Sequence, residues 1–600
     1  MEADMSVLDR IERLRNVMEQ QKIDCYIIPT DDYHHSEYVG DYFKFREYIT
    51  GFTGSAGTAV FTKDKAGLWT DGRYFIQAEA QLKGSGITLY KSGESDVPTI
   101  EEFLKSELKE GDVLGFDGRT VTYAQGKRYC HIADENGASL KYSLDFAQNI
   151  WKERPEMSME SVFSLEDEYT GEKIGSKLER IREVMKENGC NAHVLSSLDD
   201  IAWLLNIRGN DIAYCPLVLS YAIVYNNSVE LFADIRKFSD DIINLLAENQ
   251  VKIYPYEDIY RKVSEMTSED KLLLDSSIMN YSLYQAISKE TVIVDKQNPE
   301  ILMKSVKNET QAENLRKAHL KDAVAHTKFM YWLKKNIGRV EITELSASAR
   351  LEGLRAEQEH FLGPSFGPIS AYGEHGAIVH YSADEKSNVP LKEGKLFMTD
   401  TGGHYLEGST DITRTVALGE VGNIEKEHFT LVARAMLRLA NTVFLYGCSG
   451  ANLDCISREV FWKEGLNFNH GTGHGVGYLL NIHEGPINFR WKEGERPAPA
   501  LEENMVITDE PGIYIEGSHG IRLENELLVR KTVKNEYGQF MNFEILTYVP
   551  IDLDAILPEK MSTEEKEMLN HYHKQVYEKV SPYLSEEERI WLKEYTRAVK

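Results

Sequence analysis

Between residues 400 and 524 the chain carries side chains whose types suit the binding of metal ions. They are Asp400, Asp411, His474, Glu510 and Glu524. Carboxylate oxygens joined by one imidazole nitrogen match hard or borderline divalent ions such as Mn²⁺, whereas structural zinc sites are rich in thiolates. The residue types therefore predict a site for two divalent ions.

Asp400 and Asp411 each lie beside an expected strand. Residues 395–399 have the pattern of a short buried strand, Gly402-Gly403 predicts a turn, and residues 412–416 have the pattern of a returning strand. Such a hairpin can bring both aspartates to one face, where two carboxylates repel each other unless a cation lies between them. A turn aspartate and a strand-end cap would give the same local pattern without a metal.

Glu510 and Glu524 repeat this arrangement. Residues 505–508 predict a strand, and Pro511-Gly512 predicts a turn directly after Glu510. The chain returns through residues 520–523 to Glu524, so a single hairpin can bring the two glutamates together. Solvated glutamates at strand ends are the alternative, and a second acidic hairpin after the first makes that alternative weaker.

Histidines accompany the acidic hairpins. Residues 469–477 read Asn-His-Gly-Thr-Gly-His-Gly-Val-Gly, a composition that excludes a stable helix and lets the backbone approach a ligand closely. His470 and His474 belong to this segment, His483 follows it, and His380 is a further candidate. Isolated histidines are usually surface residues or hydrogen-bonded core residues, but clustering beside glycine-rich turns favours a functional site.

The order Asp, Asp, His, Glu, Glu, together with its surrounding motifs, resembles the pita-bread metallopeptidases. The motifs are Thr399–Gly402, Thr410–Thr415, His470–Gly475, Asp509–Gly512 and Ile521–Asn525. Within that family the chain is most similar to the long, three-domain form of aminopeptidase P, and the resemblance covers nearly the whole chain.

The resemblance implies a dinuclear centre that holds Mn²⁺, with Co²⁺ or Zn²⁺ as possible replacements. Asp400 binds one ion, His474 and Glu510 bind the other, and Asp411 and Glu524 bridge both. A hydroxide shared by the two ions attacks the bond between the first residue and proline. Glu510 carries the proton from this nucleophile to the leaving amine.

The resemblance also implies catalytic and substrate-binding roles for residues outside the ligand set. His380 and His483 hydrogen-bond the tetrahedral intermediate or the carbonyl that follows the scissile bond, and His470 belongs to the same inner wall. Arg522 orients the carboxylates as a neighbouring cation.

The expected activity is removal of the N-terminal residue from peptides that carry proline in the second position. A prolidase, which cleaves Xaa-Pro dipeptides, would use the same ligands and is the first alternative. A non-catalytic peptide-binding protein of the same fold is the second, and the complete ligand set makes it the weaker one.

Composition limits the partners and the compartment. A net charge of −28 argues against nucleic acid or an anionic membrane as a partner. The six cysteines are scattered without a Cys-x-x-Cys pair, which is typical of a reducing compartment. We see neither the apolar core of a signal peptide nor an apolar run of membrane-spanning length. We therefore expect a cytoplasmic protein, and the resemblance adds the expectation of a homodimer.

A chain of 600 residues requires several domains. A helix-then-strand pattern around Arg13 and Met18 recurs around Arg180 and Met185, which indicates an internal duplication. The expected fold class is α/β (α+β), with two related creatinase-like α/β domains before a pita-bread catalytic domain. The expected divisions are an N-terminal domain at 1–155, an acidic linker at 156–170, the duplicated domain at 171–300, the catalytic domain at 301–548 and a helical C-terminal extension at 549–600.

Overall fold

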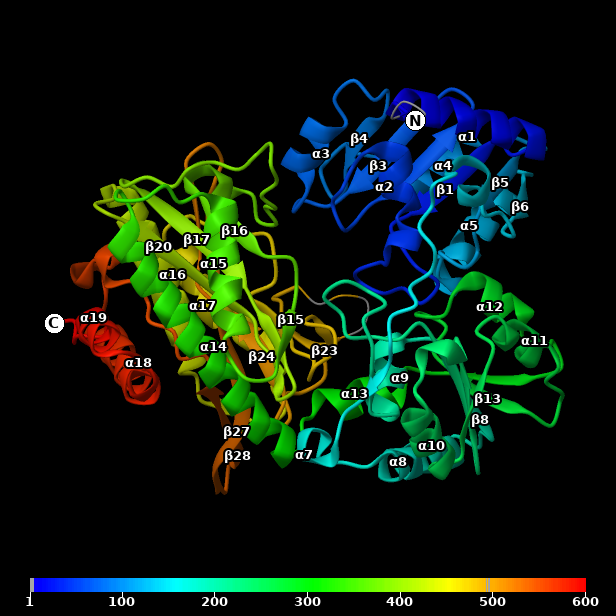
Figure 1. Ribbon diagram of the computed structural model, residues 1–600. Coiled ribbons are helices and arrows are strands. Elements are labelled where there is room, and N and C mark those ends of the chain that lie inside the picture. Colours follow the sequence, from blue (N-terminus) through cyan, green and yellow to red (C-terminus); the bar gives the residue numbers. More distant parts are fainter. Residues whose placement is uncertain (1–4, 493, 495–496) are drawn as a thin grey trace. The chain divides into compact units, whose positions relative to one another are not determined.

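The fold is given by a computed structural model, which describes residues 5–492, 494 and 497–600 (Figure 1). The chain divides into two compact units. The first contains Met1–Ser164 and Lys173–Glu300, and the second contains Leu165–Glu172 and Ile301–Lys600. The short segment before the second α/β domain therefore packs with the second unit, which contains the expected catalytic domain and is called the catalytic unit below.

The first α/β domain of unit one is built on a six-stranded sheet in the order β4-β3-β2-β1-β5-β6. Its opening helix, α1, begins at a capping box formed by Ser6 and Asp9 and buries the face that carries Leu14 and Met18. The elements are α1 (Val7–Gln21), β1 (Cys25–Pro29), α2 (Phe45–Thr50), β2 (Thr58–Thr62), β3 (Ala66–Thr70), α3 (Phe75–Gln81), β4 (Thr88–Lys91), α4 (Ile100–Glu107), β5 (Val113–Phe116), α5 (Tyr123–Glu135) and β6 (Ser139–Lys141).

The second α/β domain repeats this topology in its own six-stranded sheet, in the order β12-β11-β10-β8-β13-β14. Strand β8, like β1, pairs antiparallel with one neighbour and parallel with the other. Ile181 and Met185 of α8 are buried as Leu14 and Met18 are in α1, so the predicted duplication is confirmed. The elements are α8 (Ile174–Glu187), β8 (Ala192–Leu195), α9 (Leu198–Leu204), β10 (Tyr221–Tyr225), β11 (Val229–Phe232), α10 (Asp240–Glu248), β12 (Val251–Tyr254), α11 (Asp258–Ser264), β13 (Lys271–Leu274), α12 (Tyr281–Ala286) and β14 (Val292–Asp295).

Unit two combines a three-stranded sheet, β16-β17-β20, with a six-stranded sheet, β21-β28-β27-β24-β22-β23. The long helix α14 runs from Glu309 to Asn336. The principal elements are α14 (Glu309–Asn336), α15 (Glu344–Ala356), β16 (Ile369–Tyr372), β17 (Lys395–Thr401), β20 (Ile412–Leu418), α16 (Asn423–Ala440), β21 (Phe444–Leu445), α17 (Gly450–Trp462), β22 (Gly473–Gly475), β23 (Glu484–Phe489), β24 (Val506–Asp509), β25 (Gly512–Ile515), β26 (His519–Arg522), β27 (Asn525–Asn535), β28 (Gly538–Ile545), α18 (Thr563–Val580) and α19 (Glu586–Tyr595).

One large core joins these elements. Phe329 and Leu333 of α14, Phe397 of β17 and Val432 of α16 are buried in the same cluster, together with Leu569 of α18. Helices therefore cover one side of the curved sheets, and the C-terminal helices close the end of that layer (Figure 1). Ile369, Ala371 and Met398 form a smaller, separate buried cluster with Tyr381.

The segment expected as a linker has structure of its own. Residues Phe163–Ser164 form β7, which pairs with β9 (Ile207–Arg208), and Asp167–Thr170 form the short helix α7. Two side-chain amides at the start of α14 hold α7: the N-cap residue Asn308 donates to the carbonyl of Thr170, and Asn314 donates to that of Glu168, each at 2.8 Å. Of the helices that the structure describes, none is both long enough and apolar enough to cross a membrane.

Candidate metal centre

The first acidic hairpin places both aspartates beside paired backbone. Strands β17 and β20 are antiparallel, with Asp400 opposite Thr413, and Asp411 stands directly before β20. Both aspartates are buried, at 8% and 4% exposure. Oxygens of Asp400, Asp411 and Glu524 lie within 4.8 Å of one another, so the two hairpins meet at this point.

The second acidic hairpin has two parts. Strands β24 and β27 pair up to Asp509 and Asn525, and β25 and β26 continue the pairing from Gly512 and Arg522. Glu510 and Glu524 lie between these two paired segments, one on each side of the hairpin. Their carboxylates therefore start from neighbouring positions. The Glu524 N–H donates to the carbonyl of Thr413 at 3.1 Å, which ties this hairpin to the first.

His474 lies on β22 and faces the carboxylates. Its Nε2 is 3.5 Å from Asp411 Oδ2 and 3.6 Å from Glu510 Oε1. Its Nδ1 lies 2.9 Å from the carbonyl oxygen of Gly475, an atom that can only accept, so Nδ1 carries the ring hydrogen. The unprotonated Nε2 is therefore directed at the carboxylates, as a metal ligand would be.

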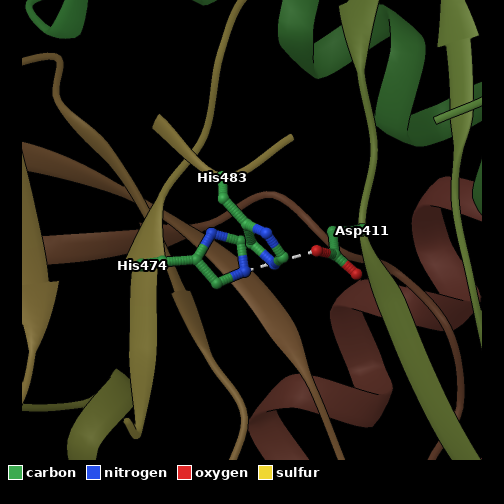
Figure 2. Close-up of side chains that lie close together, drawn as sticks. All are labelled: Asp411, His474 and His483. Atoms are coloured by element: carbon green, nitrogen blue, oxygen red, sulfur yellow. Dashed lines mark ion pairs between the residues drawn. The ribbon is translucent and has the colours of Figure 1, made fainter. Parts of the chain in front are cut away.

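His483 joins His474 beside Asp411 (Figure 2). The two imidazole rings are nearly perpendicular, at 88°, with centroids 4.2 Å apart. Ligand atoms of Asp411, His474 and His483 lie within 4.8 Å of one another, as do those of His474, Glu510 and Glu524. His483 thus lies close enough to Asp411 and His474 to share a metal ion with them, although the resemblance implies a substrate contact for it.

The crowded carboxylates carry the electrostatic signature of a cation site. Burial raises the pKa of Asp411, and the charge of Asp400 raises it further. Burial and Asp411 raise the pKa of Glu524, and burial raises that of Glu510. Asp400 Oδ1 is buried without a hydrogen-bond partner among the described residues. Divalent ions would supply the positive charge and the missing partner, so these residues fit two such ions.

Arg522 connects the centre to His470. Its Nε donates to Asp400 Oδ2 at 3.1 Å, and its Nη1 donates to the Tyr514 hydroxyl at 2.7 Å. Tyr514 lies 2.8 Å from His470 Nε2, while His470 Nδ1 lies 2.7 Å from the carbonyl of Gly471. Burial and the Arg522 charge lower the pKa of His470 to about 3, so the ring is neutral and both of its nitrogens are bonded within the protein.

His380 lies on the segment between β16 and β17, near His470, whose pKa it helps to lower. Arg522 Nη2 donates to the carbonyl of Val379 at 3.4 Å, which ties this segment to the centre. A buried carboxylate, Glu344, accepts from His375 Nδ1 at 2.8 Å on one side of His380. All the residues expected at the site therefore lie on the catalytic unit around one centre.

Sequence patterns did not indicate three residues of this neighbourhood: Glu344, Tyr514 and Glu526. Glu526 Oε1 accepts the N–H of Asp411 at 2.6 Å, and its Oε2 lies 3.1 Å from Nε2 of the buried His319. Of these three residues, only Glu526 could have been found from the sequence. It follows Glu524 by two positions, and residues two apart in a strand point to the same face.

The chain matches known families along almost its whole length. Residues 10–141 and 153–311 match the creatinase/prolidase N-terminal domain, residues 313–531 match metallopeptidase family M24, and residues 539–599 match the C-terminal region of peptidase M24. Xaa-Pro aminopeptidase 1 of Dictyostelium discoideum is 36% identical, with 97% of this chain and 94% of the relative covered. Aminopeptidase P1 of Arabidopsis thaliana is 34% identical, with 98% and 99% covered.

Solved structures give the same result. The crystal structure of X-prolyl aminopeptidase from Caenorhabditis elegans, described as a cytosolic enzyme with a di-nuclear active site, superposes with a TM-score of 0.94 at 33% identity, covering 99% of this chain and 100% of that chain. Xaa-Pro dipeptidase from Bacillus anthracis shares the fold over 64% of this chain and 99% of its own, with a TM-score of 0.51 at 24% identity. The chain belongs to metallopeptidase family M24, in the group of three-domain Xaa-Pro aminopeptidases.

Proposed function

We propose that this protein is a metal-dependent aminopeptidase that removes the N-terminal residue from peptides with proline in second position. The observation that carries the proposal is the convergence of Asp400, Asp411, His474, Glu510 and Glu524 on one buried centre. Full-length relatives named Xaa-Pro aminopeptidase support the substrate class.

Two divalent ions, when bound, would polarise the scissile carbonyl and lower the pKa of water. Asp400 would help to hold one ion, His474 and Glu510 would hold the second, and Asp411 and Glu524 would contribute to both. Glu510, whose pKa is raised by burial, takes the proton of the attacking water and passes it to the leaving nitrogen.

The remaining side chains bind and orient. His483, next to His474, donates a hydrogen bond to oxygen charge that develops during attack, and His380 binds the substrate from the opposite segment. Arg522 holds Asp400 in place through its donor hydrogen bonds. His470 contributes to the inner wall as a neutral ring, and a direct bond from it to substrate would require one of its two internal bonds to break.

Several finer assignments belong to the same proposal. Mn²⁺ is the native ion, because oxygen ligands dominate the set. The protein is a cytoplasmic homodimer, which the cytosolic Caenorhabditis elegans relative supports for the compartment. The domains divide at 1–155, 171–300, 301–548 and 549–600.

A prolidase remains the alternative, since it would use the same ligands. The solved dipeptidase shares the fold over only 64% of this chain, whereas the aminopeptidase spans 99%, which favours the longer enzyme. The test is the product formed from Arg-Pro-Pro by the Mn²⁺-loaded full-length chain, with bound metal measured in parallel.

Release of arginine and Pro-Pro, with two ions per chain, is the expected result. Cleavage of Arg-Pro but not of Arg-Pro-Pro would identify a prolidase instead. If the protein binds two ions but cleaves neither peptide, the remaining hypothesis is a non-catalytic peptide-binding protein.

A further inference from the structure

One buried arginine, Arg414, joins the two acidic hairpins from behind the metal centre. Arg414 is the third residue of β20 and is fully buried. Its Nη1 donates to the backbone oxygens of Thr413 at 2.8 Å and of Glu524 at 2.6 Å, and its Nη2 donates to Asn525 Oδ1 at 2.7 Å. These bonds join the strand that follows Asp411 to the segment that carries Glu524.

The other acceptors of this guanidinium come from the C-terminal end of the chain. Tyr572 of α18 accepts from Nη2 at 2.7 Å, and the carbonyl of Val549 accepts from the same nitrogen at 2.9 Å. The Tyr572 hydroxyl lies 2.6 Å from the Val549 carbonyl, to which it donates its own hydrogen. A buried guanidinium that loses an acceptor is left with an unsatisfied charged donor, so these bonds fix where Arg414 lies.

We propose that the C-terminal extension is a positioning element of the metal centre. Tyr572 holds Arg414, and Arg414 holds the backbone of Glu524 in the place where its carboxylate meets the other ligands. Tyr572 is a positioning residue that acts through Arg414 and touches neither ion nor substrate. The inference rests on the proposed function insofar as Glu524 is taken as a metal ligand.

The bonds around Glu524 show why its backbone position matters. The Thr413 hydroxyl donates to Glu524 Oε2 at 2.8 Å, and the Thr413 carbonyl accepts the Glu524 N–H at 3.1 Å. Arg414 bonds the carbonyls of both residues, so a shift of its guanidinium moves the pair. The Glu524 carboxylate would then leave the alignment that places its oxygens within 4.8 Å of those of Asp400 and Asp411.

Packing and hydrogen bonding by the extension can be separated. Leu569 and Val576 of α18 are fully buried in the main core, and they account for the docking of the helix. The Tyr572 hydroxyl adds hydrogen bonds to that docking, because a phenylalanine would fill nearly the same volume. Tyr572→Phe therefore removes the link to Arg414, together with the bonds to the Thr547 and Val549 carbonyls, and leaves the packing of α18 in place.

The experiment measures Mn²⁺ binding to metal-stripped full-length protein by calorimetry, together with thermal unfolding. We expect Tyr572→Phe to raise the Mn²⁺ dissociation constant about tenfold. This is the lower end of the loss of metal affinity seen when residues that orient metal ligands are removed. We expect kcat at saturating Mn²⁺ to stay near that of the wild type, with the loss of activity confined to limiting metal.

Two variants in the same helix serve as controls. Tyr577→Phe removes a hydroxyl that has no hydrogen bond to any described residue, and it should bind Mn²⁺ as the wild type does. His573→Leu removes the acceptor of the Ile551 N–H, at 3.1 Å, and breaks no hydrogen bond to Arg414. It should lower Tm but leave the Mn²⁺ affinity unchanged.

The proposal is overturned if Tyr572→Phe binds Mn²⁺ as tightly as the wild type, or if His573→Leu weakens binding equally. As a further check, Tyr572→Phe should add little to the loss of Mn²⁺ affinity caused by Arg414→Lys. If Arg414→Lys does not fold, the comparison of Tyr572→Phe with Tyr577→Phe and His573→Leu decides. Mn²⁺ binding is measured without peptide, so a wild type that binds two ions and cleaves nothing refutes the proposed function alone.

Discussion

The Tyr514 hydroxyl lies 2.8 Å from Nε2 of His470, and this bond has a defined direction. His470 Nδ1 must donate, because its partner is the carbonyl oxygen of Gly471. Nε2 therefore accepts from Tyr514, whose oxygen accepts in turn from Arg522 at 2.7 Å. Since Arg522 also binds Asp400, directed hydrogen bonds link a candidate metal ligand to a histidine of the inner wall.

Tyr514→Phe interrupts this series of hydrogen bonds between Arg522 and His470. We expect kcat/KM to fall by about 10- to 100-fold, the range for partners that orient site residues. Bound metal should change little, because Arg522 keeps its bonds to Asp400. Kinetics and metal content measured together test this, with the exposed Tyr537→Phe as control. Normal kcat/KM in Tyr514→Phe would show that this series of hydrogen bonds does not contribute to catalysis.

His483→Ala separates two roles that the geometry allows. As a donor to developing oxygen charge, His483 should contribute about 2.7–4 kcal/mol of transition-state stabilisation, and metal content should stay at the wild-type level. As a third ligand grouped with Asp411 and His474, its loss should instead release metal. We expect the first result. Near-normal activity with full metal would exclude both roles.

The metal-free protein should lose stability as the pH rises. Burial, with the Asp400 charge, raises the pKa of Asp411 to about 7 in the folded chain, and burial with Asp411 raises that of Glu524. Unfolded carboxyl groups titrate near pH 4. Because the folded-state pKa values are raised, the stabilising contribution of these groups is complete below about pH 4. The contribution of Asp411 is lost as the pH rises through about 7, and that of Glu524 is lost as the pH rises through its own raised value.

Thermal unfolding in a chelator tests this expectation. Tm of the wild type should fall between about pH 5 and pH 8 relative to the Mn²⁺-loaded protein. Asp411→Asn removes one charge from the cluster, so it should flatten this dependence, bind less metal and abolish turnover. A chelated Tm that stays constant or rises across this interval would contradict the repulsion between the carboxylates.

Glu344 should be needed for the position of His380. Its Oε1 accepts from the Tyr372 N–H and from His375 Nδ1, each at 2.8 Å, and its Oε2 accepts from the Tyr381 hydroxyl at 2.9 Å. The Tyr372 N–H can only donate, so Oε1 of Glu344 must keep an acceptor there. Glu344→Gln places N–H donors against one of these partners, which should release the segment and lower kcat/KM.

Hydrogen exchange over residues 372–389 checks the release, and Glu374→Gln, at an exposed position of the same segment, is the matched control. The bond to Glu344 raises the pKa of His375 above its ordinary value. Its stabilising contribution is therefore complete below about pH 6.5 and is lost as the pH rises through the raised value. Protection that is independent of pH in the wild type would contradict this coupling.

The sequence predicted those features that depend on local pattern. Met18 and Met185 recur at the same place in two amphipathic helices, so both α/β domains could be expected, and the acidic hairpins follow from strand and turn residues around Asp400 and Glu510. Tyr572 could not be placed at Arg414, because a tyrosine on an amphipathic helix looks the same whether its hydroxyl is bonded or solvated. Glu344 has no local motif near His380, and its contact depends on tertiary packing.

The placement of α7 with the catalytic unit has a consequence for fragments of this protein. The chain passes between the units after Ser164, after Glu172 and after Glu300. A break after Ser164 or after Glu300 divides one unit between the two products, and a break after Glu172 divides both. No single proteolytic cut therefore releases two intact halves. A truncated catalytic protein that begins at residue 301 would leave the amides of Asn308 and Asn314 without their acceptors in α7, and one that retains residues 165–172 as a separate peptide would keep them.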